Sequence, residues 1–417
     1  MRKRWIIAGL MAVLGLLAVP AAPQAHAQAT SWDISGNESV PVWAPIGTYQ
    51  HDGSGPYLGM EVVMMRTPRS LGNQPIAYRG VLMNFGSPGV GGAPLIEPGS
   101  FEGSRQVALD TETLGRTSWG PGYRLTLGYR LENGWNFSLS WLHLFDVKSS
   151  GGAGMIGEFF NHPGNFSANT FLTAPVYNFS TDFVGRNPFP NPPFTSNPTA
   201  GIWNAASDMT ILFTQRYDNW DATGKFPVFE TENARSYAIA GGRFAWIWER
   251  FQWRTSKPEL VLNSNGEFGF QTSPDSAARY LNTLSQRMYG PMVGVGHEVM
   301  LYSGAAGAFG FGTEITGAAL INIVKERSKY IREDEATQAK RVWSQMTLVP
   351  NLNIAMNLNW QPFDGMHVRL GYNFHNYFNT YYMKEPVSFN VGALDPAYDI
   401  KLWRMIQGVN AGVSFTF

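Results

Sequence analysis

The sequence predicts an all-β fold: a transmembrane antiparallel up-and-down β-barrel of about twelve strands, with short periplasmic turns and long extracellular loops. Three observations predict it. Apolar and polar residues alternate with a period of two, as in a β-strand, where successive side chains point to opposite faces. Aromatic residues such as Trp135, Trp360 and Phe363 lie at strand ends beside short turns, as they do at a membrane interface. The alternating stretches are also long enough for a tilted strand to cross a bilayer in about ten residues.

The composition excludes several classes of protein. The chain has 417 residues, of which 44% are hydrophobic and 15% are charged. Its 31 basic and 31 acidic residues leave a net charge of zero, so we expect no nucleic-acid partner. The lack of cysteine excludes disulfides, thiolate zinc sites and thiol nucleophiles. Because the sequence also lacks a phosphate-binding loop, an H-E-x-x-H pair and a G-x-S-x-G elbow, we expect no cofactor, no metal and no enzymatic activity.

The first residues have the organisation of a secretory signal peptide. Basic residues at 2–4 precede an apolar run at 5–19, and Ala25-His26-Ala27 supplies small residues for cleavage. The apolar run has about 15 residues, whereas a membrane anchor needs roughly 20, so we favour export over anchoring. The predicted organisation is a signal peptide at 1–27, a periplasmic segment at 28–56 and a barrel at 57–417 in the bacterial outer membrane.

The clearest strands form the hairpin GYRLTLGYRLENGWNFSLSWLHLF, at 122–145. Every second residue from Tyr123 to Leu131 is apolar, and Arg, Thr or Gly lie between them. Asn133-Gly134 is a strong turn signal, and the alternation resumes after it. A second hairpin turns at Asp364-Gly365.

The same alternation along the chain predicts the remaining strands. They lie near 57–66, 75–84, 102–112, 207–217, 235–254, 280–301, 308–324, 343–360, 366–380 and 402–417, in addition to the two strands of the 122–145 hairpin. If the last strand ends in the periplasm, the long segments all lie outside the cell: 148–206, 255–279, 325–341 and 381–401. Two connections, 218–234 and 85–101, are longer than this scheme expects for periplasmic turns.

The final strand carries apolar residues at every second position. This set resembles the signal by which the barrel-assembly machinery recognises outer-membrane barrels, and it comprises Val409, Ala411, Val413, Phe415 and Phe417. The expected partners are therefore that machinery and outer-membrane lipid, and a homo-oligomer is compatible with the sequence. The alternative is an edge strand of a soluble secreted β-sandwich. Such a protein would be released into buffer without detergent.

The polar face of the strands predicts a pore for passive diffusion of small hydrophilic solutes. The residues assigned to its lining are Arg124, Arg130, Arg216, Glu298, Glu314, Asn351, Asn353, Asn357, Asn359, His367, Arg369 and His375. One alternative is a barrel that conducts nothing and has a structural or adhesive role, in which these charges pair with one another. A less favoured one is a hydrolase at the outer rim, for which the best candidate group is His143, Asp146, Ser149 and Ser150.

Several stretches together resemble a known family. They are PYLGMEVVMMR (56–66), QPIAYRGV (74–81), NGWNFSLSWLHLF (133–145), RMYGPMVGVGHEVML (287–301), INIVKERSKY (321–330), LVPNLNIAMNLNWQPFDGMHVRLGYN (348–373) and LDPAYD (394–399). This set resembles planctomycete-type exported outer-membrane β-barrel proteins, related to the Legionella-type pore-forming outer-membrane protein family. The resemblance implies a porin-like barrel over most of 57–417. It implies no solute and no catalytic residue.

Overall fold

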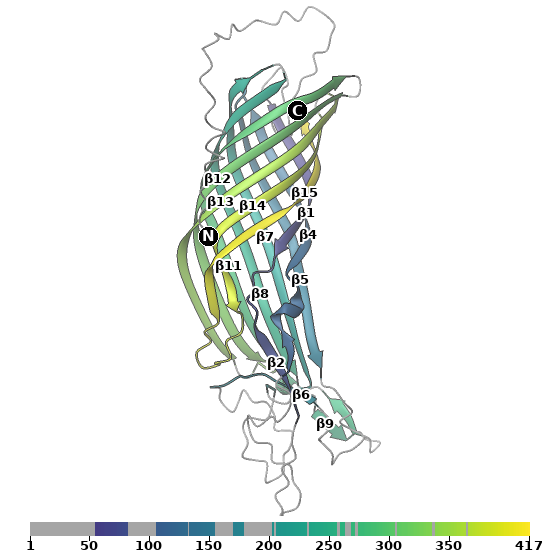
Figure 1. The fold of residues 1–417 in the computed structure, drawn as a ribbon, viewed down its shortest axis with the longest axis vertical. Coiled ribbons are helices and arrows are strands. Elements are labelled where there is room, and N and C mark those ends of the chain that lie inside the picture. Colours follow the sequence, from purple (N-terminus) through teal and green to yellow (C-terminus); the bar gives the residue numbers. More distant parts are fainter. Residues whose placement is uncertain are drawn as a thin grey trace, which may run out of the picture. The chain divides into compact units, whose positions relative to one another are not determined.

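Ten antiparallel strands form a closed barrel in the computed structural model of the chain (Figure 1). The structure describes residues 55–81, 106–131, 133–154, 170–178, 202–203, 206–231, 233–256, 259–262, 268–271, 274–304, 307–335, 338–363 and 366–417. The predicted signal peptide and nearly all of the predicted periplasmic segment lie outside these residues. The barrel strands are β1 (Gly55–Pro68), β4 (Thr117–Arg130), β5 (Asn136–Gly154), β7 (Asp208–Glu230), β8 (Ala234–Ser256), β11 (Ala277–Gly304), β12 (Gly307–Arg332), β13 (Gln338–Phe363), β14 (Met366–Glu385) and β15 (Ala397–Thr416).

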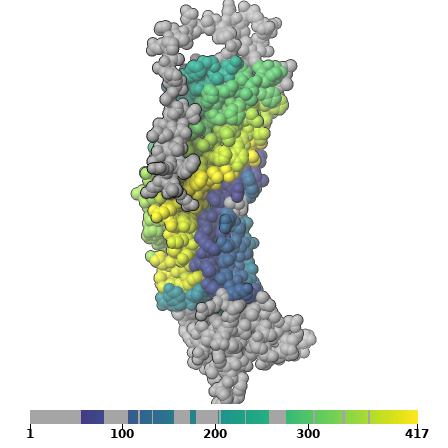
Figure 2. Space-filling view, in the orientation of Figure 1, coloured from purple at the N-terminus to yellow at the C-terminus, as the bar shows by residue number. Residues whose placement is uncertain are grey.

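The ring closes where the first strand meets the last. β1 pairs with β15 on one edge and with β4 on the other, so neither strand is left as an edge. Figure 2 shows this junction, with the N-terminal strands in purple and blue against the C-terminal strands in yellow. Each other strand pairs with its two neighbours in chain order, which confirms the predicted up-and-down barrel. Closure satisfies the backbone hydrogen bonds that lipid cannot.

The ring has ten strands, whereas the sequence predicted about twelve. The predicted strands at 75–84 and 102–112 do form in part, as β2 (Pro75–Val81) and β3 (Val107–Asp110), but they join β6 (Thr170–Thr173) in a separate small sheet. Two further short strands, β9 (Glu259–Leu262) and β10 (Phe268–Gln271), pair with each other. The described helices are two 3-10 turns, η1 (Thr111–Leu114) and η5 (Pro274–Ser276). No described helix has the length and the apolar character that crossing a membrane requires.

The turns at one end of the barrel are short, and the connections at the other end are mostly long. Short turns join β4 to β5, β7 to β8, β11 to β12 and β13 to β14 at the upper end of Figure 1. Gly134 has a φ of +80° in the first of these turns, a conformation that glycine adopts without strain. The small sheet and β9 lie at the lower end. This arrangement confirms the prediction of short turns on one side and long loops on the other.

Two predicted connections are wrong because the strands are longer than the sequence analysis assumed. The segment 218–234 belongs almost entirely to β7 and β8, and the segment 325–341 to β12 and β13. β11 has 28 residues and β12 has 26, whereas crossing a bilayer takes about ten. The strands therefore continue well beyond the hydrocarbon, where their outer face no longer has to be apolar.

The outer wall is apolar where the predicted alternation is strongest. On β1, Leu58, Met60 and Val62 are 43%, 57% and 68% exposed, whereas Glu61 and Val63 between and beyond them are 2% and 1% exposed. The predicted terminal signal follows the same rule, since Val409, Phe415 and Phe417 are exposed. Its recognition by the assembly machinery stays a prediction.

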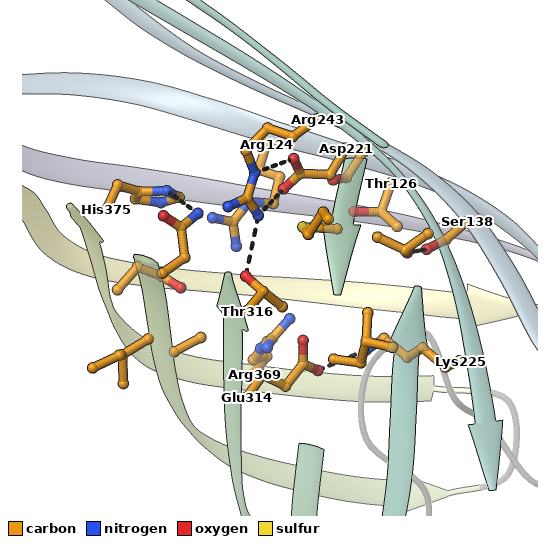
Figure 3. A pocket seen from close by; sticks show the side chains of 18 of the residues that line it. Arg124, Thr126, Ser138, Asp221, Lys225, Arg243, Glu314, Thr316, Arg369 and His375 are labelled. Atoms are coloured by element: carbon orange, nitrogen blue, oxygen red, sulfur yellow. Dashed lines mark hydrogen bonds and ion pairs between the residues drawn. The ribbon is translucent and has the colours of Figure 1, made fainter. Parts of the chain in front are cut away.

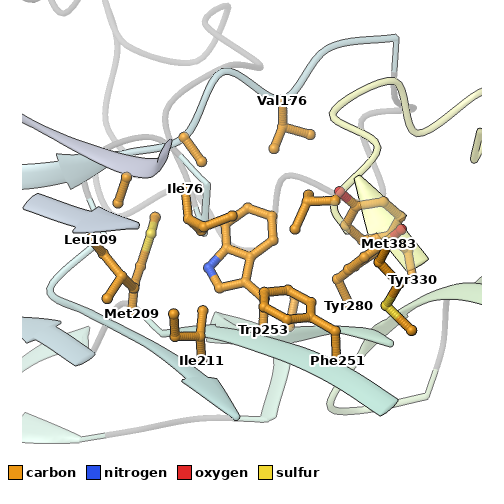
Figure 4. Packing of buried hydrophobic residues seen from close by; sticks show 14 of the residues in the cluster. Ile76, Leu109, Val176, Met209, Ile211, Phe251, Trp253, Tyr280, Tyr330 and Met383 are labelled. Atoms are coloured by element: carbon orange, nitrogen blue, oxygen red, sulfur yellow. The ribbon is translucent and has the colours of Figure 1, made fainter. Parts of the chain in front are cut away.

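A hydrophobic cluster fills the barrel at its loop end. Ile76, Leu109 and Val176 come from the connecting segments and pack in one cluster with Trp253 and Tyr280 of the barrel wall (Figure 4). Residues of the β14–β15 connection, namely Val387, Val391 and Leu394, join the same cluster. The interior at this end is therefore a packed protein core.

The wall has a gap between β13 and β14 on the loop side. Their pairing ends at Asn351 and Tyr377, and the segment 338–350 of β13 is paired only with β12. The loop-side part of β14 instead bonds to a connecting segment, because Met383 exchanges backbone hydrogen bonds with Ser70 and Gly72. We call this gap the seam. A cavity of about 390 Å³ lies along it, lined by residues that include Trp343, Tyr381 and Tyr398.

Candidate functional site: the barrel lumen

The lumen on the short-turn side of the hydrophobic cluster is lined by charged and amide side chains. Strand alternation places them there, because successive side chains of a strand point to opposite faces of the wall. They surround a cavity of about 120 Å³, which is large enough to hold several water molecules. Three groups of ion pairs form its walls.

The first group is centred on Glu61 of β1. Its carboxylate accepts hydrogen bonds from Arg124 at 3.1 Å, from Arg369 at 3.2 Å and from the side-chain amide of Asn410 at 2.8 Å. The side chain of Glu61 is 2% exposed, so the two guanidinium groups compensate a carboxylate held away from solvent. This group joins four neighbouring strands on one side of the lumen.

The second group lies on β7, β8, β11 and β12. The ammonium of Lys225 donates to Glu314 at 2.6 Å, and the hydroxyl of Tyr237 donates to Glu314 at 2.8 Å and to Glu298 at 3.0 Å. Figure 3 shows Lys225 and Glu314 pointing toward each other across the cavity. The two carboxylates thus share one tyrosine hydroxyl, and Glu314 also pairs with the lysine.

The third group is centred on Arg243 of β8. Its guanidinium donates to both oxygens of Asp221, at 2.7 and 3.0 Å (Figure 3). It also donates to Asn351 at 2.5 Å. Asn353 lies beside it and contacts the Nδ1 atom of His375 at 2.7 Å. The bidentate geometry fixes the plane of the guanidinium in the lumen.

Two contacts cross the lumen between opposite walls, and we call them the braces. The hydroxyl groups of Tyr217 on β7 and Tyr377 on β14 lie 2.7 Å apart. The guanidinium of Arg404 on β15 donates to Glu249 on β8, at 2.5 and 3.3 Å. Each brace joins strands that lie halfway around the ten-stranded ring from each other. The braces lie between the polar cavity and the hydrophobic cluster, at a level where buried apolar residues such as Ile247, Met288 and Ile406 pack together with Tyr217 and Tyr377.

Eleven of the twelve residues predicted to line a pore do lie on the inner face. They are Arg124, Arg130, Glu298, Glu314, Asn351, Asn353, Asn357, Asn359, His367, Arg369 and His375. The prediction for Arg216 is wrong, because its side chain lies on the outer wall. There it pairs with Asp146 at 2.8 Å and lies over the ring of Trp248 at 5.6 Å. Any role of the eleven in passage stays a prediction.

The structure does not bring the candidate hydrolase group together. Asp146 pairs with Arg216, and His143 instead contacts Asp218 at 2.7 Å on the outer wall, beside the ring of Trp141. Among the described residues, no group of three histidine, aspartate or glutamate side chains could hold a metal ion. The expectation that the chain is not an enzyme stays a prediction.

The sequence predicts neither brace. Tyr217 and Arg404 lie inside predicted strands, but alternation along one strand does not identify a partner on the opposite wall. Glu249 is the better signal, since a carboxylate within the aromatic segment FAWIWERFQW needs a partner if it faces inward. Asp221 and Lys225 are not predicted to line the lumen, because the sequence predicts a connection at 218–234.

A closed antiparallel ring with an apolar outer band and a charged interior defines the chain as an outer-membrane β-barrel protein. The comparison with known families agrees. Residues 104–396, more than half of the chain, match the family described as Legionella pneumophila major outer membrane protein precursor. The chain belongs to this Legionella outer membrane protein family. No curated protein matches the sequence.

Solved outer-membrane barrels are similar to the chain at a coarse level. The outer membrane protease OmpT from Escherichia coli matches 88% of this chain and 97% of its own, with 11% identity and a TM-score of 0.33. A mutant of the monoaromatic hydrocarbon channel TodX matches 88% and 91%, with 8% identity and a TM-score of 0.21. A Pseudomonas aeruginosa FadL homologue matches 88% and 90%, with 9% identity and a TM-score of 0.18. These likenesses are too distant to carry functional information.

Proposed function

We propose that the protein is a porin-like channel for passive diffusion of small hydrophilic solutes, and that the braces together with the hydrophobic cluster at the loop end hold it closed in this structure. The observation that carries the proposal is the free hydrogen-bonding capacity of the lumen. Among the described residues, both amide atoms of Asn359, the Oδ1 atom of Asn357 and one carboxylate oxygen of Glu298 are buried and have no protein partner. Buried polar groups need partners, and water or a hydrophilic solute would supply them.

The ion pairs of the lumen support the same proposal. A buried ion pair adds little stability compared with apolar side chains of the same volume. A barrel with only an anchoring role would be as stable with an apolar interior, such as the one it has at the loop end. The polar interior between the short turns and the braces therefore calls for a role in contact with water or solutes.

Planar-bilayer recording of the full-length protein tests the proposal. We expect discrete conductance steps with long closed periods, and we expect more frequent openings for Tyr217→Phe/Arg404→Met, which removes both braces while keeping side chains of similar size. The outward substitution Tyr289→Phe is the control, because this residue is 42% exposed on the outer wall, and it should leave the open probability unchanged. Arg124→Glu should shift the reversal potential in a KCl gradient toward cation selectivity.

A non-conducting structural barrel is the second candidate, and the filled loop end of the lumen favours it. In that case neither the native protein nor the brace variant gives conductance steps, even at high protein load. Heat-modifiable migration in SDS gels shows whether each variant is folded, so that an absence of conductance can be assigned to a closed barrel and not to an unfolded one. An absence of conductance in the folded native protein and in the folded brace variant overturns the channel proposal.

A further inference from the structure

A patch of basic side chains lies on the outer wall of the barrel, on the loop side of the apolar band. We call it the basic patch, and it comprises Arg250 of β8, Arg287 of β11 and Lys325, Arg327 and Lys329 of β12. All five lie at outward positions of their strands, and all except the half-buried Lys329 are exposed. The residues between those of β12, Glu326 and Ser328, are buried and face inward.

Strand pairing brings these residues together. Arg250 lies opposite Thr283, and Thr283 lies opposite Arg327, so Arg250 and Arg327 are two strand spacings, or about 10 Å, apart. Lys325 lies opposite Ser285 in the adjacent row. Along β12 the three basic residues recur at every second position, roughly 7 Å apart. Two hydroxyl-bearing residues therefore lie among five cations.

No described carboxylate compensates the basic patch. Neighbouring arginines do have acidic partners: Arg216 pairs with Asp146, and Arg254 and Arg279 lie 2.6 and 3.7 Å from Glu333. The hydrogen bond from Arg254 lowers the pKa of the Glu333 carboxyl. Within the part of the chain that the structure describes, none of the five patch residues lies within 4.0 Å of a carboxylate. Like charges on adjacent strands repel one another, so this arrangement needs an external anion.

The surroundings of the patch fix its depth in the membrane. Two tryptophans lie on its short-turn side. Arg250 is 4.7 Å from the ring of Trp248, and Arg287 is 5.8 Å from that of Trp246. The indole nitrogen of Trp246 donates to Ser285 at 3.0 Å. Tryptophan is typical of the boundary between hydrocarbon and headgroups. Farther along β11 toward the short turns, Tyr289 and Val293 are 42% and 66% exposed in the apolar band. The basic patch thus lies at headgroup depth, where phosphate is the abundant anion.

We propose that the basic patch binds the phosphate group of a lipid in the outer leaflet, with the acyl chains of that lipid against the adjoining apolar band. Arg250 and Arg327 supply planar donors for phosphate oxygens, and the lysines add charge. The hydroxyls of Thr283 and Ser285 lie in the same rows. The spacing of about 10 Å between the two arginines allows more than one phosphate to be held at once.

Titration calorimetry tests this on the full-length barrel in maltoside micelles, with dihexanoyl phosphatidic acid as the probe and dihexanoyl phosphatidylcholine as the zwitterionic reference. Each basic residue near a charged headgroup adds about fivefold to binding, so Lys325→Gln/Lys329→Gln should raise the Kd for phosphatidic acid by roughly 5–25-fold. The matched control is Lys384→Gln/Lys401→Gln, which removes the same charge from exposed positions of β14 and β15. It should change the Kd by less than about twofold.

Three results would overturn the proposal. Equal loss of affinity in both double variants would mean that net charge alone attracts the lipid. Equal affinity of the native protein for phosphatidylcholine would mean that phosphate monoester charge is not recognised. Inorganic phosphate binding as tightly as the lipid would make the patch a site for a soluble phosphorylated compound. Because all four substitutions are on the outer surface, unchanged heat-modifiable gel migration should accompany each measurement.

Discussion

Replacing Arg404 with methionine should destabilise the folded barrel by about 3 kcal/mol, because it leaves the carboxylate of Glu249 buried without its counter-ion. Glu249 is 0% exposed and Arg404 is 1% exposed, so solvent cannot replace the lost charge. Breaking a buried pair from one side typically costs about 3–5 kcal/mol. The lower end applies here, since Gln215 still donates to Glu249 at 2.9 Å and Ser70 donates as well. A loss of about 3 kcal/mol lowers the ratio of folded to unfolded protein by roughly 100-fold.

The assay is equilibrium unfolding in urea of the protein in lipid vesicles, followed by tryptophan fluorescence. The second variant, Glu249→Gln/Arg404→Met, removes both charges and should recover most of the loss, because no unpaired charge remains. The matched control is Arg216→Met, which removes an ion pair with Asp146 at the surface, where the two side chains are 37% and 33% exposed. Loss of this exposed pair should lower the free energy of unfolding by less than about 1 kcal/mol. Equal losses in Arg404→Met and Arg216→Met would refute the reasoning, as would a double variant no more stable than the single one.

Three further substitutions test the remaining parts of the fold. Val293→Arg puts a charge in the apolar band and should cost about 2–4 kcal/mol in vesicle refolding, whereas a neutral result would show that lipid does not contact this face. Trp253→Ala leaves a cavity in the hydrophobic cluster at a fully buried position, so it should lower the free energy of unfolding by about 3–5 kcal/mol and speed proteolysis of the loops. Unchanged loop proteolysis would contradict the packing described. Gly290→Ala would place a Cβ atom 2.0 Å from the carbonyl oxygen of Ala319 and should lower the unfolding free energy by more than about 1 kcal/mol. The control Gly317→Ala should not lower it, because its Cβ atom would be 4.0 Å from the nearest atom. Equal effects of the two substitutions would argue against the close approach at Gly290.

The membrane-facing part of the fold could be predicted because hydrocarbon imposes a simple rule on the outer wall. From Tyr123 to Trp141 of the hairpin, apolar residues face lipid and the residues between them face the lumen, so alternation identified both strands and their facing, whereas Leu142 and Leu144 beyond them face inward. The same rule placed eleven of twelve polar residues on the inner face. The ends of the strands could not be predicted, because they lie in water, where the outer face does not have to be apolar.

The rule reverses on the loop side, and the errors follow from that reversal. There the interior is a packed core and the exterior is aqueous, so Ile211 and Phe213 are buried inside while Arg216 lies outside. The segment Lys325 to Tyr330 reads as a charged loop by composition. It still alternates with a period of two, with basic residues outward and Glu326, Ser328 and Tyr330 inward. Pairings across the lumen, such as that of Tyr217 with Tyr377, depend on the ring size and could not be derived from alternation.

The seam gives the two ends of the barrel different mechanical freedom. On the short-turn side of Asn351 and Tyr377 the circumference is fixed, because any expansion would break backbone hydrogen bonds between strands. On the loop side no backbone pairing joins β13 to β14, and side-chain contacts such as that of Asn379 with the carbonyl oxygen of Leu348 hold them together with the hydrophobic cluster inside. Side-chain packing therefore sets the circumference of the mouth, whereas backbone hydrogen bonds set that of the membrane-embedded ring.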